Sequence, residues 1–527
     1  MAARPCDPST FASVLPSNAI IEAAVSVANG SSYGEGAPLN IAFPTNPTNL
    51  PELCAITVRI PTSSSSRVRF GLFLPTAPKW NNRFLAVGNG AFAGGINWLD
   101  MGSGAQYGFA SMSTDTGHNS SGADVTWALG NSATKEDFGY RAMHLSVTYS
   151  QKMVEAFNGK GWDWSYYSGC STGGRQGLKE AQLYPDSFDG VLVGAPAWWT
   201  SHLQTWTTKV AKDNLPDGSP NRIPPGLFSV IAKEAVRQCD GADGVLDGII
   251  SAPEKCQLDL SKIQCGTEGV DASACLTAAQ IQTAEKIYGD YITDDGKFAF
   301  PGLKVGSENL WGVVLGAPAP NPLGQDYIKY FLLDDASWKW ETYNDSLVWR
   351  ADALDPGHPS ATKFDMSSFR DLKGGKNKKI IMYHGLADGL IPTGSSTYFY
   401  EQVASAMGSM SGVQDWFRYF LVPGMGHCAG TSVDAPWYIG GGNQAGSLGT
   451  GVYSTPGFGD AQHDILLGLM NWVEKGEPVD KVIATTWTKS SDATSGVLRQ
   501  RPLCAYPKTA RLEAGKDEKR AESWTCK

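Results

Sequence analysis

Segments of alternating or continuous apolar residues follow one another along the chain, separated by segments whose apolar positions recur at helical spacing. The first 65 residues are loop-rich, and two helices are expected over 137–159, ending at Gly159, and over 460–476. Between the strand "WSYYSGC" and Pro185, a glycine-rich turn leads into a further helix. Strands are expected at 54–61, 67–75, 83–90, 108–118, 188–197, 378–385 and 416–424. This alternation predicts a mostly parallel sheet covered on both faces, an α/β fold.

The stretch 198–375 interrupts the alternation. It contains four cysteines, many Pro and Gly residues and clustered tryptophans such as "WWTSHLQTW". Connections between a strand and a helix usually span about 2–6 residues, so this stretch is too long for a loop. We predict a lid domain at 198–375 that is inserted into a catalytic domain made of 1–197 and 376–527.

Composition narrows the possible functions. The chain has 527 residues, of which 42% are hydrophobic and 18% charged, as is typical of a folded globular protein. Its formal net charge of -9 argues against nucleic acid or an anionic membrane surface as a partner. No apolar run approaches the roughly 20 residues that span a bilayer, so we expect no membrane association.

Ten cysteines indicate an oxidising compartment, because an even count suits five disulfides. Sequons at Asn29, Asn119 and Asn344 are typical of a secreted glycoprotein. The start "MAARPCDPST" lacks the apolar core of a signal peptide, so we expect a mature secreted enzyme whose leader was replaced by an initiating Met. The alternative is a cytosolic protein with reduced thiols.

A candidate nucleophile lies in "SYYSGCSTGGRQG", which contains the frame G-x-S-x-G at Gly169, Ser171 and Gly173. A strand precedes this frame and a helix follows it, which is the setting of a nucleophile elbow. The small flanking residues allow the sharp turn that exposes the serine hydroxyl. The frame also occurs by chance, so its partners elsewhere in the chain decide its meaning.

Those partners occur in the order serine, acid, histidine that is expected of an α/β-hydrolase. Asp388 follows a buried strand in "KIIMYHGLADGLIPTG", and His427 lies in the loop after the next strand, in "YFLVPGMGHCAG". His427 would take the serine proton, and Asp388 would fix the histidine tautomer. His384 and His463 are rival bases, but neither occupies the expected loop.

Backbone N–H groups must stabilise the oxyanion that forms during acyl transfer. One donor should be Thr172, the residue after the nucleophile. The second should come from the early glycine-rich loop "VGNGAFAGG", where Gly90 is the first candidate and Asn89 the next.

Cysteines flank both reacting residues, because Cys170 precedes the serine and Cys428 follows the histidine. If Ser171 meets His427, these cysteines lie within disulfide range. The alternative, Cys170 as a thiol nucleophile, would leave an unpaired cysteine in an oxidising setting. The other eight could pair in many ways. Nearness favours Cys239–Cys256, Cys265–Cys275 and Cys504–Cys526, leaving Cys6–Cys54.

An acidic loop, "CDGADGVLDGII", presents hard oxygen ligands on a tight turn. Three aspartates and two backbone carbonyls could form a calcium site that braces the lid rather than taking part in chemistry. The spacing differs from that of an EF-hand, and a solvated acidic turn is the alternative. The candidate ligands are Asp240, Asp243, Val245, Asp247 and Ile249.

The motifs "GCSTGG", "GLADGLIP" and "GMGHC" together resemble the fungal tannase/feruloyl esterase family over nearly the whole chain. The resemblance implies an α/β-hydrolase core with a lid that binds the aromatic acyl group. It also implies the disulfide pairs given above, the catalytic set Ser171, Asp388 and His427, and structural calcium in the acidic loop.

Within that family, "GCSTGGRQG" is more similar to the type B feruloyl esterase branch, because tannases tend to have an acidic residue where Thr172 stands. The resemblance implies a secreted serine carboxylesterase that releases ferulate, p-coumarate or caffeate from plant cell-wall polysaccharide such as xylan. One alternative is a tannase acting on gallate esters. Another is a catalytically silent carbohydrate-binding protein on the same scaffold.

Overall fold

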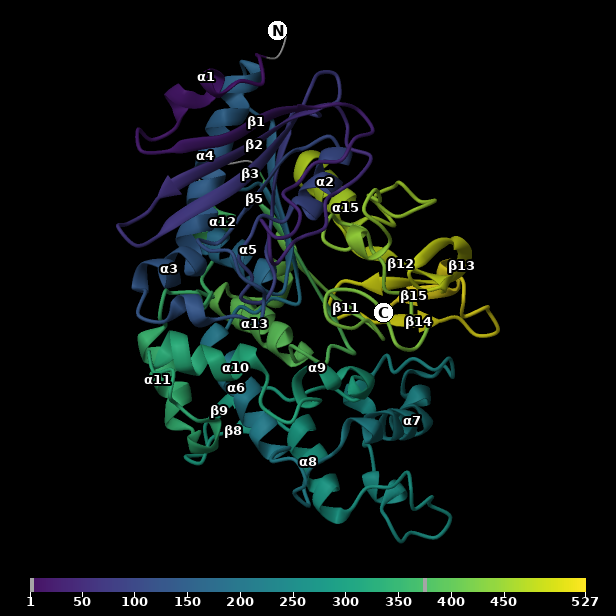
Figure 1. Ribbon diagram of the computed structural model, residues 1–527. Helices are drawn as coiled ribbons and strands as arrows, with labels where there is room; N and C mark the ends of the chain where they lie inside the picture. Colours follow the sequence, from purple (N-terminus) through teal and green to yellow (C-terminus); the bar gives the residue numbers. More distant parts are fainter. Residues whose placement is uncertain (1–3, 373–376) are drawn as a thin grey trace.

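The computed structural model describes residues 4–372 and 377–527, and a nine-stranded sheet forms its centre (Figure 1). The sheet order is β1-β2-β3-β5-β4-β6-β7-β10-β11. Strands β1, β2, β3 and β5 pair antiparallel, whereas the pairs from β5 through β4 to β11 are parallel. The strands are β1 (Ile20–Val27), β2 (Leu53–Pro61), β3 (Arg67–Pro75), β4 (Arg83–Val87), β5 (Ala110–Thr114), β6 (Trp164–Cys170), β7 (Gly190–Gly194), β10 (Lys379–Gly385) and β11 (Phe417–Val422).

Every strand expected from the apolar pattern is present, but the pattern missed β1. This strand lies at the edge of the sheet, where several of its side chains face solvent, so it lacks a clear apolar face. The helix expected at 137–159 begins as a π-helical turn and continues as α4 (Ala142–Asn158), which ends at Gly159 with φ of 69°. The last helix, α15 (Ile465–Lys475), starts later than expected, so His463 precedes it.

Two apolar cores, one on each face, enclose the sheet. On one face α4, α5 (Thr172–Leu183) and α13 (Thr393–Ala406) pack over alternate strand residues such as Val191 and Met382. On the other face α2 (Trp98–Gln106) and α15 cover the intervening residues, such as Leu192 and Ile381. Because successive strand side chains point to opposite faces, the strands contribute apolar residues to both cores. Helices cover both faces of the sheet, as the α/β pattern predicts.

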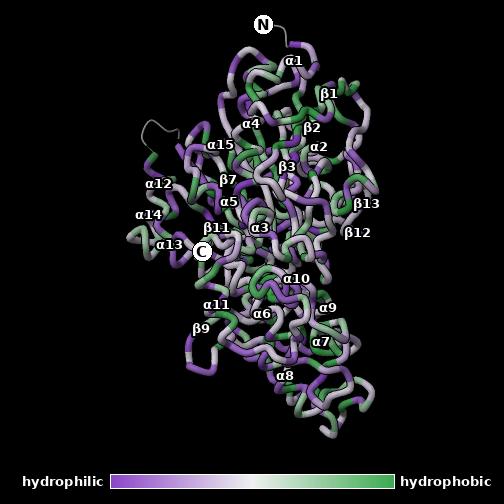
Figure 2. Tube along the Cα trace, turned by 60° about the vertical axis from the view of Figure 1, so that its left-hand side comes forward, coloured by the Kyte–Doolittle hydropathy of each residue, from purple (hydrophilic) through white to green (hydrophobic). Residues whose placement is uncertain are grey.

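The chain between β7 and β10 leaves the sheet and forms a lobe with its own core (Figures 1 and 2). Because these two strands are paired neighbours, the lobe is an insertion between adjacent strands. The boundary predicted for the end of the lid, at 375/376, lies outside the described residues. Ala361, Met366 and Phe369, which the sequence assigned to the lid, pack in the core under α13. The main lid helices are α6 (Thr200–Asp213), α7 (Phe228–Cys239), α8 (Ala278–Tyr288), α10 (Pro322–Asp326) and α11 (Ser346–Leu354).

A C-terminal β-hairpin, which the sequence pattern did not predict, extends the catalytic part. Strands β12 (Lys481–Lys489) and β13 (Asp492–Cys504) pair antiparallel, and β14 (Ala510–Leu512) pairs with β15 (Trp524–Cys526). An isolated β-bridge joins Phe420 of β11 to Ala505, the residue after β13, so the hairpin lies beside the edge strand β11. None of the helices in the described ranges has both the length and the apolarity needed to cross a bilayer.

Candidate active site

Ser171 lies at the turn between β6 and α5, at the C-terminal edge of the parallel strands. Its backbone has φ of 63° and ψ of -124°, a conformation that residues other than glycine rarely adopt. The turn brings the start of α5 so close to the early loop that a Cβ atom on Gly173 would lie 2.9 Å from the Asn89 carbonyl oxygen. Glycine is therefore required there. The strained backbone and the close approach are the features of a nucleophile elbow.

Asp388 and His427 follow β10 and β11 and meet at the same edge of the sheet. The His427 Nδ1 atom lies 2.7 Å from Asp388 Oδ2, and the Asp388 side chain is completely buried. The second carboxylate oxygen accepts hydrogen bonds from the backbone N–H groups of Leu390 and Ile391, at 2.8 Å and 2.9 Å. These contacts fix the plane of the carboxylate and, through it, the orientation of the His427 ring.

The buried carboxylate stays ionised because of its neighbours. Burial by itself raises the pKa of Asp388, but the charge of His427 and the hydrogen bonds from His384 and His427 outweigh burial. The pKa of Asp388 is therefore well below its usual range. An anion at this position stabilises the imidazolium that forms when His427 accepts a proton.

The two rival histidines occupy other places. His384 is completely buried behind the acid, with Nε2 at 3.0 Å from Asp388 Oδ2 and Nδ1 at 2.8 Å from Ser396 Oγ. It positions the carboxylate and does not face Ser171. His463 instead contacts Asp460 at 3.0 Å and stacks on Phe458. Neither rival combines a loop position beside the elbow with a free ring nitrogen.

A disulfide between Cys170 and Cys428 joins the nucleophile loop to the histidine loop. The two Cα atoms are 5.9 Å apart although 258 residues separate them in sequence. Ser171 and His427 are the immediate chain neighbours of this bridge. No cysteine is free among the described residues, so Cys170 is not available as a thiol nucleophile. The other pairs are Cys6–Cys54, Cys239–Cys256, Cys265–Cys275 and Cys504–Cys526, those that nearness favoured.

The Nε2 atom of His427 is the reactive end of this arrangement. It is buried and makes no hydrogen bond to any residue that the structure describes, while Nδ1 is held by Asp388. A neutral imidazole that donates through Nδ1 has its lone pair on Nε2. The ring is thus prepared to accept a proton from a group next to the disulfide. In many enzymes without substrate, the hydrogen bond between nucleophile and base is long, and it shortens only when substrate binds.

The expected oxyanion donors are backbone N–H groups at the start of α5 and in the early glycine-rich loop. The Thr172 hydroxyl donates to the Ala91 carbonyl at 2.6 Å, which ties the start of α5 to the early loop. The Asn89 N–H is already bonded to the Gln176 side chain at 3.0 Å. Within the described chain, the N–H groups of Thr172 and Gly90 have no acceptor. Gly90 is therefore a better candidate than Asn89 for the second donor.

The lid reaches the site through Leu310. A Cβ atom on Gly389 would lie 2.6 Å from the Leu310 backbone, and one on Gly426 would lie 2.7 Å from its side chain. The loops that carry Asp388 and His427 therefore both press against this lid residue. The reacting residues lie between the sheet edge and the inserted lobe.

The acidic loop is tightly held by bonds within the protein. Asp240 accepts hydrogen bonds from the N–H groups of Gly248 and Ile249 at 3.0 Å and 3.1 Å, and Asp243 accepts one from Val245 at 3.0 Å. Asp247 forms a buried ion pair with Arg501 of the hairpin. No group of three or more His, Cys, Asp or Glu side chains in the described ranges is arranged to hold a metal ion.

The chemistry of these donors nevertheless suits calcium, because three carboxylates and the carbonyls of Val245 and Ile249 are all hard oxygen ligands. A calcium ion would have to share Asp247 with Arg501, and Asp240 with the backbone of its own loop. The ligand set predicted from the sequence therefore fits in type, while its carboxylates already have protein partners.

Several supporting residues were not predicted from the sequence. Gln176 holds the early loop, His384 supports the acid, Leu310 contacts both catalytic loops, and Arg501 neutralises Asp247. For Gln176, the only local signal of its role was its position about one helical turn after the elbow. Leu310 and Arg501 come from segments distant in sequence, so no motif marks them, whereas His384 lies four residues before Asp388 in the same motif and was considered only as a rival base.

The Cys170–Cys428 bridge should be needed for full activity. Replacing both cysteines by alanine should lower kcat/KM by about 10- to 100-fold, because a displacement near 1 Å between reacting groups can cost that much. Initial rates on an aryl ester and the midpoint of thermal unfolding would be measured together. The control removes Cys265 and Cys275, a lid disulfide that should leave the rate unchanged. Full activity of the first variant would contradict the bracing role.

An α/β sheet with this elbow, acid and histidine places the chain among the carboxylic ester hydrolases of the α/β-hydrolase class. A family model described as "Tannase and feruloyl esterase" matches residues 54–527. The chain belongs to the tannase and feruloyl esterase family.

Individual relatives agree with this assignment. The chain is 33% identical over 476 residues to a probable feruloyl esterase B-1 of Neosartorya fischeri, covering 90% of this chain and 86% of the relative. It is 31% identical to a probable feruloyl esterase B-2 of Aspergillus terreus, covering 94% and 92%. The crystal structure of feruloyl esterase B from Aspergillus oryzae matches with a TM-score of 0.89 and 30% identity, covering 99% of each chain. A tannin acyl hydrolase from Aspergillus niger, at 22% identity and a TM-score of 0.76 over 99% and 95% of the two chains, shares the fold.

Proposed function

We propose that Ser171 is the nucleophile of a feruloyl esterase, with His427 as general base and Asp388 as its orienting acid. The observation that carries this proposal is the state of His427. Its Nδ1 atom is fixed on a buried carboxylate, its Nε2 atom is unbonded among the described residues, and a disulfide ties its loop to Ser171. This arrangement supports base catalysis beside a serine hydroxyl.

The reaction follows from these positions. Ser171 Oγ attacks the ester carbonyl carbon while His427 Nε2 takes the hydroxyl proton, and the N–H groups of Thr172 and Gly90 stabilise the oxyanion. The alcohol then leaves with the proton from His427, and an acyl-enzyme remains. A water molecule, deprotonated by His427, attacks the acyl carbon, and the acid and the free serine are released.

The substrate class comes from the relatives. The relatives described above that share 30% or more identity with this chain are named feruloyl esterase B, B-1 or B-2, whereas the tannin acyl hydrolase shares 22%, so hydroxycinnamate esters such as those of ferulate, p-coumarate or caffeate are the proposed substrates. Five disulfides support secretion, and Asn29, Asn119 and Asn344 are exposed, as glycosylation requires. A secreted esterase of this class would act on feruloyl groups attached to plant cell-wall polysaccharide.

Substrate preference separates this proposal from a tannase. We expect kcat/KM for methyl ferulate to exceed that for methyl gallate by about tenfold or more, a difference near 1.4 kcal/mol in transition-state binding. Initial rates on the two esters at several concentrations measure it directly. A preference for methyl gallate would show that the chain is a gallate esterase of the same family.

The acidic loop forms a second part of the proposal: a structural calcium ion bound by Asp240, Asp243, Asp247 and the carbonyls of Val245 and Ile249. Its hard-oxygen donor set supports calcium, and its ion pair with Arg501 places the loop where the lid meets the C-terminal hairpin. Bound there, the ion would stabilise the junction between lid and hairpin and would take no part in the reaction.

Removing calcium should lower the thermal unfolding midpoint by about 4 °C, because a ligand that binds only the folded state stabilises it. The initial rate at 25 °C should change less than twofold. Differential scanning calorimetry with and without EGTA, and with calcium added back, measures the shift. An Asp243→Asn variant should no longer respond to calcium, and an unchanged wild-type midpoint would mean that the loop holds no calcium.

A further inference from the structure

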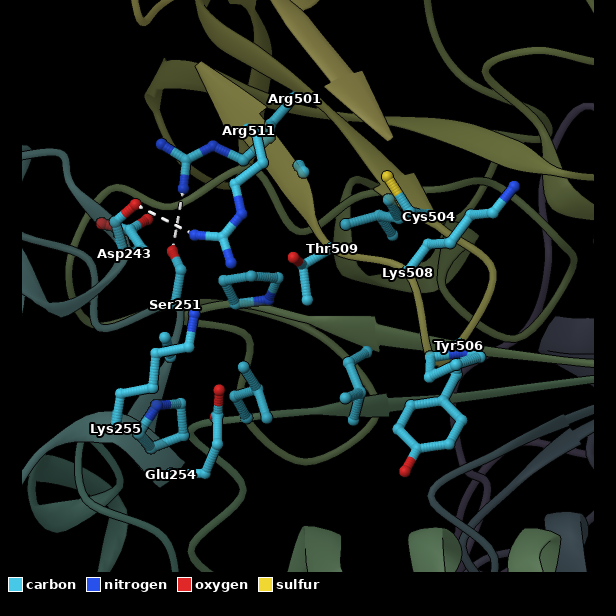
Figure 3. Close-up of a pocket in the computed structure, with 18 of the residues that line it drawn as sticks. Asp243, Ser251, Glu254, Lys255, Arg501, Cys504, Tyr506, Lys508, Thr509 and Arg511 are labelled. Carbon is cyan, nitrogen blue, oxygen red and sulfur yellow. Dashed lines mark hydrogen bonds between the residues drawn. The ribbon is translucent and has the colours of Figure 1, made fainter. Parts of the chain in front are cut away.

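A cavity lies between the C-terminal hairpin, the lid segment 251–255 and the end of β11 (Figure 3). Its volume is about 360 Å³, and Ser171, Asp388 and His427 are not among its lining residues. Ligand sites for small molecules usually have volumes of roughly 300–1,000 Å³. The cavity is thus large enough for one ligand of the size of a substituted aromatic ring.

The walls of this cavity are mainly apolar. Leu386, Leu421 and Leu503 line it, together with four prolines and Trp524. The guanidinium carbon of Arg501 lies 4.1 Å from the centre of the Trp524 ring. Such walls favour a flat, apolar body over a small hydrated ion.

Five cationic side chains line the same cavity, against two carboxylates. Arg501 is engaged by Asp247 and Ser251. The remaining cations have no carboxylate partner among the described residues. Arg511 donates one hydrogen bond, to the Asp243 carbonyl at 3.3 Å. These unpaired cations are Lys255, Lys304, Lys508 and Arg511.

The cations are not spread evenly around the cavity. Figure 3 shows the Lys255 ammonium and the Arg511 guanidinium on the same side, near Ser251, whereas Lys508 extends away from them. Lys304 is half-buried near the start of α13, where a Cβ atom on Gly394 would lie 3.9 Å from its Cε atom. The protein as a whole has a net charge of -9, so an unpaired basic cluster in a cavity is a local exception that attracts anions.

We propose that this cavity is a non-catalytic binding site for an aryl carboxylate of hydroxycinnamate size. The apolar walls hold the ring, and Lys255 and Arg511, together with Lys304, bind the carboxylate through charge-assisted hydrogen bonds. The site does not depend on the proposed esterase reaction, because it contains none of the three reacting residues. If that reaction is correct, the acid it releases belongs to the class of ligand that fits here.

Binding of ferulate to enzyme whose serine has been blocked with a sulfonyl fluoride tests the proposal. Isothermal titration calorimetry should detect one remaining site per chain. A variant carrying Lys255→Glu and Lys304→Glu should bind ferulate at least about tenfold more weakly, whereas Lys233→Glu should bind like the wild type. Lys233 is an exposed lysine in α7 that does not line the cavity. Lys255 is exposed at the end of a single 3-10 turn and Lys304 is in a loop, so the variants should retain the wild-type unfolding midpoint.

Two further ligands test the two halves of the recognition. Coniferyl alcohol, which keeps the ring but lacks the carboxylate, should bind at least about tenfold more weakly than ferulate. Inorganic phosphate should not compete with ferulate at equal concentration. The proposal is overturned if blocked enzyme binds no ferulate, if charge reversal at Lys255 and Lys304 leaves affinity unchanged, or if phosphate displaces ferulate equally well. Failure of the esterase proposal would appear instead as lack of turnover and would leave this binding intact.

Discussion

Replacing Ser171 by alanine should lower kcat on methyl ferulate by about 10⁴- to 10⁶-fold, the range seen when the nucleophile of a serine hydrolase is removed. The alanine lacks the oxygen that forms the acyl-enzyme, so only binding and oxyanion stabilisation remain. Steady-state rates, together with trapping of the acyl-enzyme by rapid acid quench and mass spectrometry, would measure the loss. The variant should unfold at the same temperature as the wild type.

Ser168 provides a matched control in the strand that leads to Ser171. It is buried in β6 three residues before the nucleophile, and its hydroxyl makes no hydrogen bond to the described residues. Ser168→Ala should therefore keep activity within about twofold of the wild type. If Ser171→Ala retained the wild-type rate, the serine mechanism would be wrong.

Replacing Asp388 by asparagine should lower kcat by about 10⁴-fold while leaving the fold intact. The amide is neutral, and its NH₂ group would face the His427 nitrogen that now donates a hydrogen bond, so the wrong tautomer would be favoured. It would also lose the anion whose pKa His427 and His384 hold well below the usual range. Because that pKa is depressed, the wild-type carboxylate remains ionised in mildly acidic solution.

An aspartate and histidine pair outside the candidate site offers the comparison. Asp460 contacts His463 at 3.0 Å in an exposed position before α15. Asp460→Asn should change kcat less than twofold, since His463 lies outside the candidate site. Equal losses in the two variants would indicate a general effect of removing carboxylates and would argue against the assigned role of Asp388.

Local sequence patterns were sufficient for most of the sheet. Strands such as β7 and β10 are built around continuous apolar segments, and this pattern indicates burial on both faces. The edge strand β1 escaped prediction because half-exposed residues carry no such signal. The C-terminal hairpin escaped for a related reason: much of β13 is exposed, and its importance comes from contacts with β11 and the acidic loop.

The candidate site was predictable where chemistry depends on immediate chain neighbours. The turn at Ser171 needs glycine at positions 169 and 173, and the acid and histidine each follow a buried strand, so these residues leave local marks. The cysteines next to Ser171 and His427 also indicated that these two distant motifs meet, because a disulfide could join them. Leu310, which supports the site from the lid, leaves no mark because its role is set by contacts across the fold.

The sequence by itself determined the class of fold, the order of the candidate catalytic residues and the adjacency of Cys170 to Ser171 and of His427 to Cys428, because these depend on local backbone geometry and burial. Only the tertiary structure decided that the Asn89 N–H is occupied by Gln176, that Arg501 pairs with Asp247, and that a basic cavity lies beside the hairpin. Those features join segments far apart in the chain, and their energies depend on distances that no local pattern encodes.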